Sequence, residues 1–333
     1  MNNQIFTVIG GGTGTFSILN GLKKYSEHIN AVVTMADSGG SARKERDEWG
    51  LLPNSDIRKS LIALADISSD NSLLLRQLFQ YRFSNQKGIS GMTFGNLFLA
   101  TLTKLLKSQK KAIEKAGELL NIKGKVIPVT MDKVHLKAVY ENGSVVVGEH
   151  FIDEPRHDGR LAIKKLSTHP SAQATKEVVR AIMQSDVLII GPGGFYTTIL
   201  ANLVIGGVVE AIQKSKARKI FIMNLMTEYG QTYGFSASRF ISELNRYFST
   251  DLLDFVVINN KPIPDKILKR YKKYQAQPIV NDLSPHHRYR IIETDLLSTE
   301  LVKRVRGDRL QRSLIRHDAD KLAAVCMKIL NLL

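Results

Sequence analysis

The chain has little cysteine and no long apolar run. Its 333 residues contain a single cysteine, Cys326, so no disulfide can form within the chain and no cysteine-based metal site can be built. Such low cysteine usage is typical of a reducing cytoplasm. No apolar run approaches the roughly 20 residues that span a bilayer, and the first residues lack the basic start of a signal peptide. We therefore expect a cytoplasmic protein without a membrane span.

Acidic residues are scarce relative to basic ones. The sequence holds 47 Lys and Arg against 31 Asp and Glu, a formal net charge of +16. A basic balance attracts polyanions or phosphorylated ligands, although it can also be a solvated surface without a function. The sequence has no zinc-finger spacing, no basic-zipper heptads and no aromatic-basic RNA-binding signature, so we do not expect a nucleic-acid partner.

Strand and helix patterns alternate along most of the chain, which predicts an α/β fold with a Rossmann-like, doubly wound, mostly parallel sheet. Residues 121–168 interrupt the alternation with short β-rich segments and the turn signal Glu141-Asn142-Gly143, so we expect a small β-rich insertion within one domain that spans residues 1–333. The expected strands are Ile5–Ile9, Ile29–Met35, Val126–Thr130, His135–Tyr140, Ser144–Glu149, Leu161–Leu166, Val187–Ile190, Lys219–Met223 and Phe255–Ile258. The expected helices are Thr15–Lys23, Ile57–Asp66, Ser72–Phe83, Gly95–Leu106, Ala112–Leu120, Thr175–Gln184, Phe195–Gln213, Ala237–Tyr247, Pro264–Tyr274 and one from about Asp320.

Two glycine-rich loops follow buried strands and precede helices. The first is Gly10-Gly11-Gly12-Thr13-Gly14, and the second is Gly191-Pro192-Gly193-Gly194 followed by Phe195-Tyr196-Thr197-Thr198. Glycines expose backbone N–H groups, and a helix N-terminus adds partial positive charge, so each loop is a potential phosphate seat. The first loop lacks the third glycine of the dinucleotide fingerprint, where Thr15 stands, and it is not a P-loop. We expect the loops to lie side by side and to hold a diphosphate.

Two aspartates stand near the expected phosphate seat. Asp37 follows the second strand, within Asp37-Ser38-Gly39-Gly40-Ser41, and Asp56 precedes Ile57-Arg58 at the start of a helix. Two carboxylates beside bound phosphates suit Mg²⁺, so Asp37 and Asp56 are the candidate metal-binding and catalytic residues. The alternatives are that Asp37 caps a loop and that Asp56 caps the helix as its N-cap residue.

Further polar segments complete the candidate site. Gly95-Asn96 opens a helix, Asn224–Thr232 follows a strand, and Arg316 could donate to a phosphate or could be a surface residue. The candidate ligand-binding residues are Gly11, Gly12, Thr13, Gly14, Asp37, Ser41, Arg58, Asn96, Gly193, Gly194, Tyr196, Thr197, Asn202, Asn224, Thr227 and Arg316.

These motifs, in this order, resemble the CofD-like superfamily, and within it the YvcK-like gluconeogenesis-factor group. The resemblance covers nearly the whole chain and includes Leu78–Phe83 and Arg316-His317-Asp318 as well as the loops. It departs from the YvcK pattern at Asp37-Ser38, where the family has two acids or an acid and Asn, and at Gly194, where the family has Ser.

The resemblance implies a Rossmann-like fold, a homodimer, and binding of UDP-sugars such as UDP-N-acetylglucosamine by the positions that match Thr13, Asn202 and Arg316. It also implies support of cell-wall synthesis and cell shape during growth on gluconeogenic carbon, through protein partners and without an established catalytic activity. The related 2-phospho-L-lactate transferases use a nucleoside diphosphate-activated donor and Mg²⁺, with an acid that corresponds to Asp37.

The sequence therefore leaves two competing hypotheses for the function: a nucleotide-sugar-binding regulator, and a Mg²⁺-dependent phosphotransferase. An NAD-dependent dehydrogenase is a weaker third reading, because Thr15 replaces the third glycine and no acid/base pair for a substrate is evident.

Overall fold

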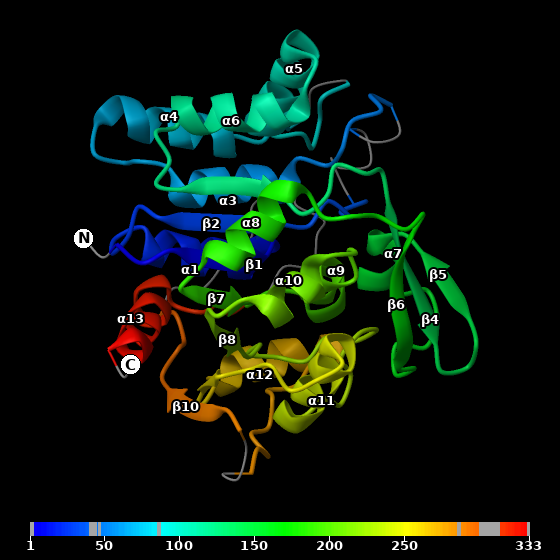
Figure 1. Ribbon diagram of the computed structural model, residues 1–333. Coiled ribbons are helices and arrows are strands. Elements are labelled where there is room, and N and C mark those ends of the chain that lie inside the picture. Colours follow the sequence, from blue (N-terminus) through cyan, green and yellow to red (C-terminus); the bar gives the residue numbers. More distant parts are fainter. Residues whose placement is uncertain are drawn as a thin grey trace.

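A parallel sheet of seven strands forms the centre of the computed structural model, which describes residues 3–39, 45, 48–84, 88–284, 288–299 and 314–331 (Figure 1). The strand order is β10-β9-β8-β7-β1-β2-β3, and every neighbouring pair is parallel. The strands are β1 (Phe6–Gly10), β2 (Ile29–Val33), β3 (Lys125–Pro128), β7 (Val187–Ile190), β8 (Arg218–Ile222), β9 (Phe255–Asn259) and β10 (Arg290–Thr294). The order reverses between β1 and β7, which confirms the doubly wound prediction.

Both faces of this sheet are buried, as its strand sequences require. Leu188 and Ile190 of β7 belong to one apolar cluster, whereas Ile189 between them belongs to another, because successive side chains point to opposite faces. Helices α1 (Gly12–Leu22), α3 (Ser55–Leu64), α4 (Asp70–Gln80), α5 (Phe94–Leu106), α6 (Gln109–Leu119) and α13 (Ala319–Leu330) contribute to the cluster of Ile189. Helices α8 (Lys176–Gln184), α10 (Val208–Lys214) and α11 (Ala237–Phe248) contribute to the other.

A second sheet is small and antiparallel, with the order β5-β4-β6. It contains β4 (His135–Tyr140), β5 (Val145–Val147) and β6 (Ile163–His169), and the short helix α7 (Glu149–Asp153) packs against it. Figure 1 shows this sheet at one side of the molecule, apart from the large sheet. The predicted β-rich insertion is present, but β3 pairs with β2 in the large sheet, so the small sheet begins only at His135.

Several boundaries differ from the sequence prediction. The expected helix 195–213 is interrupted: a π-helix (η1, Phe195–Leu200) leads into α9 (Ala201–Leu203), and α10 starts anew after Gly207, whose φ of 89° is left-handed. Asp56 is not the N-cap of its helix, since Asn54 occupies that position and α3 begins at Ser55. Strand β10 was not predicted. Helix α12 (Asp265–Tyr271) and a 3₁₀ turn at Lys272–Tyr274 share the predicted helix 264–274.

None of the helices in the described ranges is long and apolar enough to cross a membrane.

Candidate functional site

The two glycine loops touch each other at the point where the strand order reverses. Strands β1 and β7 are parallel neighbours, so the loops that follow them emerge at the same edge of the sheet. A Cβ atom on Gly14 would lie 2.3 Å from the carbonyl oxygen of Pro192, and one on Gly193 would lie 3.4 Å from the carbonyl oxygen of Gly11. Gly14 therefore has to be glycine, because the backbone of the second loop occupies the space of a side chain.

Hydrogen bonds from three buried or partly buried side chains fix these loops. The Thr15 hydroxyl accepts from the Gly11 N–H at 2.6 Å, and Asn202 Nδ2 donates to the carbonyls of Gly10 (2.9 Å) and Thr198 (2.8 Å). In the same way, Asn224 Nδ2 donates to the carbonyl of Gly193 at 2.8 Å. Thr15 and Asn202 are fully buried. Thr15, which replaces the third glycine of the dinucleotide fingerprint, therefore has a structural role: its side chain stabilises the conformation of the loop.

The accessible part of the cradle is backbone. Helix α1 starts at Gly12, which has a φ of 65° and open space where a Cβ would be, and Thr13 beside it is partly exposed. Across the seam, Gly194 is partly exposed at the N-terminus of η1. The first N–H groups of a helix have no partner within that helix, so two adjacent helix N-termini favour a ligand with two linked anionic groups.

Four carboxylates lie beside this cradle, and we call Asp37, Asp56, Glu149 and Asp153 the acidic cluster. Asp56 Oδ2 would lie 2.5 Å from a Cβ on Gly11. Burial, followed by the charge of Asp56, raises the pKa of Asp37 to about 6. Burial, followed by the charges of Asp37 and Asp153, raises the pKa of Glu149 well above its usual value. Asp153 also has a raised pKa, mainly through burial. The cluster thus disfavours its own full ionisation.

Counter-charge near the cluster is limited. Lys59 Nζ donates to Asp56 Oδ1 at 2.8 Å, and its charge also acts on Asp37. The backbone N–H of Ser38 donates to Glu149 Oε2 at 3.2 Å, which joins the small sheet's α7 to the segment after β2. Sequence reasoning missed Glu149 and Asp153, because no motif marks them and the insertion carries them to the site from far along the chain.

The acidic cluster has the oxygen ligands that Mg²⁺ prefers. Within the described part of the chain, however, no three His, Cys, Asp or Glu side chains are grouped closely enough to hold a metal ion. Asp37 and Asp56 could therefore supply only part of a coordination shell, with phosphate oxygens and water as the other ligands. Mg²⁺ stays a prediction.

Arg58 and Asn96 form a buried network apart from the loops. Arg58 Nε donates to Asn96 Oδ1 at 2.9 Å, and Asn96 Nδ2 donates to Glu45 Oε1 at 2.7 Å. Burial raises the pKa of Glu45 to about 7. The side chains of Arg58 and Asn96 are used to join α3 and α5, which makes them internal contacts in this structure.

Tyr196 likewise points into the protein. Its side chain is buried, and its hydroxyl donates to Glu243 Oε1 of α11 at 2.8 Å. Arg246 in turn contacts the same carboxylate at 2.5 Å. The structure therefore places the Tyr196 side chain away from the cradle. Thr197, by contrast, lies at the glycine loop, where its hydroxyl would stand 2.7 Å from a Cβ on Gly194.

The remaining candidates follow β8 or precede α13. Thr227 pairs with Gln277 through its backbone N–H (2.8 Å) and through its hydroxyl, which accepts at 2.9 Å. Arg316 precedes His317, a buried imidazole whose Nε2–H donates to the carbonyl of Met223 at 3.1 Å, directly after β8. Burial lowers the pKa of His317 to about 4, so the ring is neutral at pH 7. Ser41 lies outside the described residues.

A comparison with known protein families finds a match over most of the chain. The family model described as 2-phospho-L-lactate transferase CofD matches residues 6–297. The chain belongs to the CofD family.

Within the CofD family, the chain is similar to proteins called gluconeogenesis factors. It is 38% identical to a putative gluconeogenesis factor from Thermoanaerobacterium thermosulfurigenes, over 99% of this chain and 98% of that one. It is 33% identical to the gluconeogenesis factor of Bacillus subtilis, over 97% of both chains. The crystal structure of a UPF0052-family protein from Bacillus halodurans superimposes with a TM-score of 0.86 at 33% identity, covering 98% of this chain and 99% of that one. The predicted family and fold are thereby confirmed.

Proposed function

We propose that this CofD-family chain is a cytoplasmic nucleotide-sugar-binding regulator whose ligand is of the UDP-N-acetylglucosamine type. The observation that carries the proposal is the contact between two glycine loops at the point where the strand order reverses. Open α/β sheets bind their ligands in the crevice beyond the strand ends at such a point. The gluconeogenesis-factor names of the relatives support a role in growth on gluconeogenic carbon. The proposal extends this role to cell-wall synthesis and cell shape.

In this proposal the diphosphate lies across the seam between the loops. The N–H groups at Gly12 and Thr13 donate to one phosphate, those of Gly193 and Gly194 face the other, and Arg316 adds a charge-assisted hydrogen bond. Asn202 acts indirectly, because its amide already holds the Gly10 carbonyl. The regulatory signal would pass through a homodimer or through a protein partner.

Isothermal titration of the full chain with UDP-N-acetylglucosamine tests the proposal. We expect binding to the wild-type chain and about tenfold weaker binding to Thr13→Val. This substitution keeps the backbone N–H and the shape of the side chain but removes the hydroxyl, which in this proposal also donates to the phosphate; a hydrogen bond to a charged group is worth about 1.5 kcal/mol. Thr101→Val on the exposed part of α5 is the matched control and should bind like wild type. No heat of binding at millimolar ligand would refute the proposal.

A second function is favoured by one observation, the closeness of Asp37, Asp56 and the first glycine loop. In a transferase of the 2-phospho-L-lactate type, Asp37 and Asp56 would hold Mg²⁺, which when bound neutralises phosphate charge. Turnover of a nucleoside diphosphate-activated donor that is lost in Asp37→Asn, with binding preserved, would establish this activity. Tight binding without turnover would favour the regulator.

A further inference from the structure

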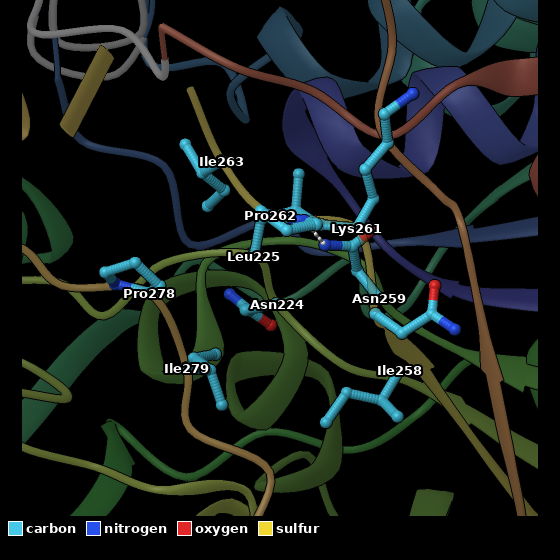
Figure 2. Close-up of a pocket in the computed structure, with 10 residues that line it drawn as sticks. Asn224, Leu225, Ile258, Asn259, Lys261, Pro262, Ile263, Pro278 and Ile279 are labelled. Atoms are coloured by element: carbon cyan, nitrogen blue, oxygen red, sulfur yellow. Dashed lines mark hydrogen bonds between the residues drawn. The ribbon is translucent and has the colours of Figure 1, made fainter. Parts of the chain in front are cut away.

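A cavity of about 200 Å³ opens at the ends of β8 and β9, next to the glycine loops (Figure 2). Pockets that hold a drug-sized ligand measure about 300–1,000 Å³, so this cavity is on the scale of a single ring rather than of a whole nucleotide. Its lining residues come from the segments that follow the two strands and from a third segment that crosses them. They include Asn224, Ile258, Asn259, Asn260, Ile263 and Ile279.

This cavity is one hydrogen bond away from the proposed diphosphate seat. Asn224 lines the cavity, and its Nδ2 donates to the carbonyl of Gly193 in the second loop at 2.8 Å. Since β8 and β9 follow β7 in the sheet, the cavity lies along the same edge, whereas Asp37 follows β2 on the opposite side of the seam. A ligand whose phosphates span the seam would therefore extend one end into the cavity and the other toward the acidic cluster.

The walls of the cavity combine apolar surfaces with fixed amides. Ile258, Ile263 and Ile279 supply apolar contact, and Figure 2 shows Asn224 between Leu225 and Ile279. Because Asn224 Nδ2 is used by Gly193, its amide orientation is fixed, and its Oδ1 is a buried acceptor for which the described chain supplies no donor. A ligand N–H would satisfy that acceptor, and a buried acceptor left without a donor is unfavourable.

Asn259 supplies the complementary donor. Its Oδ1 accepts from the N–H of Leu296 at 3.0 Å, and its Nδ2 donates to the carbonyl of Lys261 at 2.7 Å, a bond drawn dashed in Figure 2. An amide NH₂ has two hydrogens, so one remains for a ligand acceptor. The cavity thus offers an acceptor and a donor beside its apolar side chains, and Asn260 and Lys261 add further polar surface.

We infer that this cavity is the nucleobase subsite of the proposed nucleotide ligand, and that it takes a uracil-type ring, in which a ring N–H lies between two carbonyl oxygens. The inference rests on the proposed function. The ring N–H would donate to Asn224 Oδ1, and a ring carbonyl would accept from Asn259 Nδ2. A cytosine ring presents an unprotonated nitrogen at the same edge and would leave Asn224 Oδ1 without a donor. The hydroxyl-rich sugar would then face the acidic cluster, whose carboxylates accept hydrogen bonds.

Titration of the unmodified full chain with UDP and with N3-methyl-UDP tests the base contact without changing the protein. We expect N3-methyl-UDP and CDP to bind at least tenfold more weakly than UDP, a difference of about 1.4 kcal/mol. Equal affinities for UDP and N3-methyl-UDP would overturn the inference and leave the proposed function intact. If neither UDP nor UDP-N-acetylglucosamine binds, the proposed function itself fails.

A substitution at the rim of the cavity provides the second test. Asn260 is exposed there, and its backbone N–H, which donates to the Thr294 carbonyl, is kept in any variant. Asn260→Trp should fill the mouth of the cavity and weaken UDP binding at least tenfold, while the affinity for inorganic pyrophosphate stays within twofold of wild type. Asn260→Ala, the matched control, leaves the cavity open. Unchanged UDP affinity in Asn260→Trp would mean that the base binds elsewhere, as it would if the ligand lay with its base at Asp37.

Discussion

The two ends of the candidate site differ in charge although both lie at the same edge of one sheet. At the end near β2, the carboxylates of the acidic cluster crowd together and their pKa values rise. At the end near β8 and β9, no carboxylate lines the cavity, and apolar side chains stand beside Lys261 and beside amides whose orientations are fixed by backbone contacts. The difference shows that the symmetric pair of glycine loops cannot by itself decide which way a ligand lies. The flanking groups supply that direction.

We expect the largest effect on stability and binding from a substitution where the two glycine loops touch, between the two ends of the site. Gly14→Ala would place a methyl group against the Pro192 carbonyl, where only backbone could move, so we expect a loss of about 1–3 kcal/mol in the free energy of unfolding and no detectable nucleotide-sugar binding. Urea unfolding and titration calorimetry measure both.

Gly117→Ala in α6 is the matched control for that substitution. It is also a helical glycine, but its added methyl group would meet the movable end of the Ile122 side chain at 2.9 Å. Because alanine is the better helix former, this variant should keep wild-type binding and lose little stability. A Gly14→Ala protein that binds like the control would show that the loops are not held together at this point.

The acidic end should make binding depend on pH and on divalent cations. The pKa of Asp37 is raised to about 6, so this group becomes charged as the pH rises from 5 to 8 and then repels a diphosphate. Without divalent cations, we expect affinity for UDP-N-acetylglucosamine to fall by about fivefold over this range, equivalent to a charge interaction of about 1 kcal/mol. Millimolar Mg²⁺ should restore it.

Asp37→Asn is the control for this pH dependence, since its side chain cannot ionise. The fall in affinity should be reduced in this variant, and a profile identical to wild type would separate Asp37 from the ligand. The same raised pKa has a consequence for the free protein: the stabilisation that Asp37 gives below its unfolded pKa of about 4 is lost as the pH rises through about 6.

We expect the smallest effect on binding at Tyr196, whose side chain lies at neither end of the candidate site. Tyr196→Phe removes the hydrogen bond to the buried Glu243, so the free energy of unfolding should fall by about 1 kcal/mol while nucleotide-sugar affinity stays within twofold. Tyr25→Phe, at an exposed tyrosine, should change neither quantity. A marked loss of affinity in Tyr196→Phe would place its hydroxyl at the ligand after all.

Local sequence patterns predicted the elements that carry the two loops. The β1–loop–α1 and β7–loop units follow from apolar runs that end in glycines, and parallel strands bring such loops to one edge. The interruption of the helix after Leu203 was less evident, although Gly206-Gly207 is a signal that could have been used. Strand β10 was missed, because Arg290–Thr294 is only partly buried and its pattern is weak.

The parts of the site that sequence could not predict are those made by contacts between distant segments. Glu149 and Asp153 approach Asp37 and the segment after β2 only because the small sheet folds back toward β2. The cavity needs Asn224, Asn259 and Pro278, which share no motif and meet only when β8 and β9 pair. Tyr196 stands two residues after a glycine, which favoured a ligand contact, but the geometry of η1 directs its ring inward.

The side-chain hydrogen bonds that fix the two glycine loops also affect the rate at which a ligand can bind. Thr15, Asn202 and Asn224 already fix the backbone of both loops through hydrogen bonds. Ligand binding would therefore not have to order a flexible segment, and little conformational entropy would be lost on binding. A rigid, open receptor of this kind admits its ligand at a rate set by diffusion and charge. Differences in affinity among nucleotides should therefore arise from how long each stays bound.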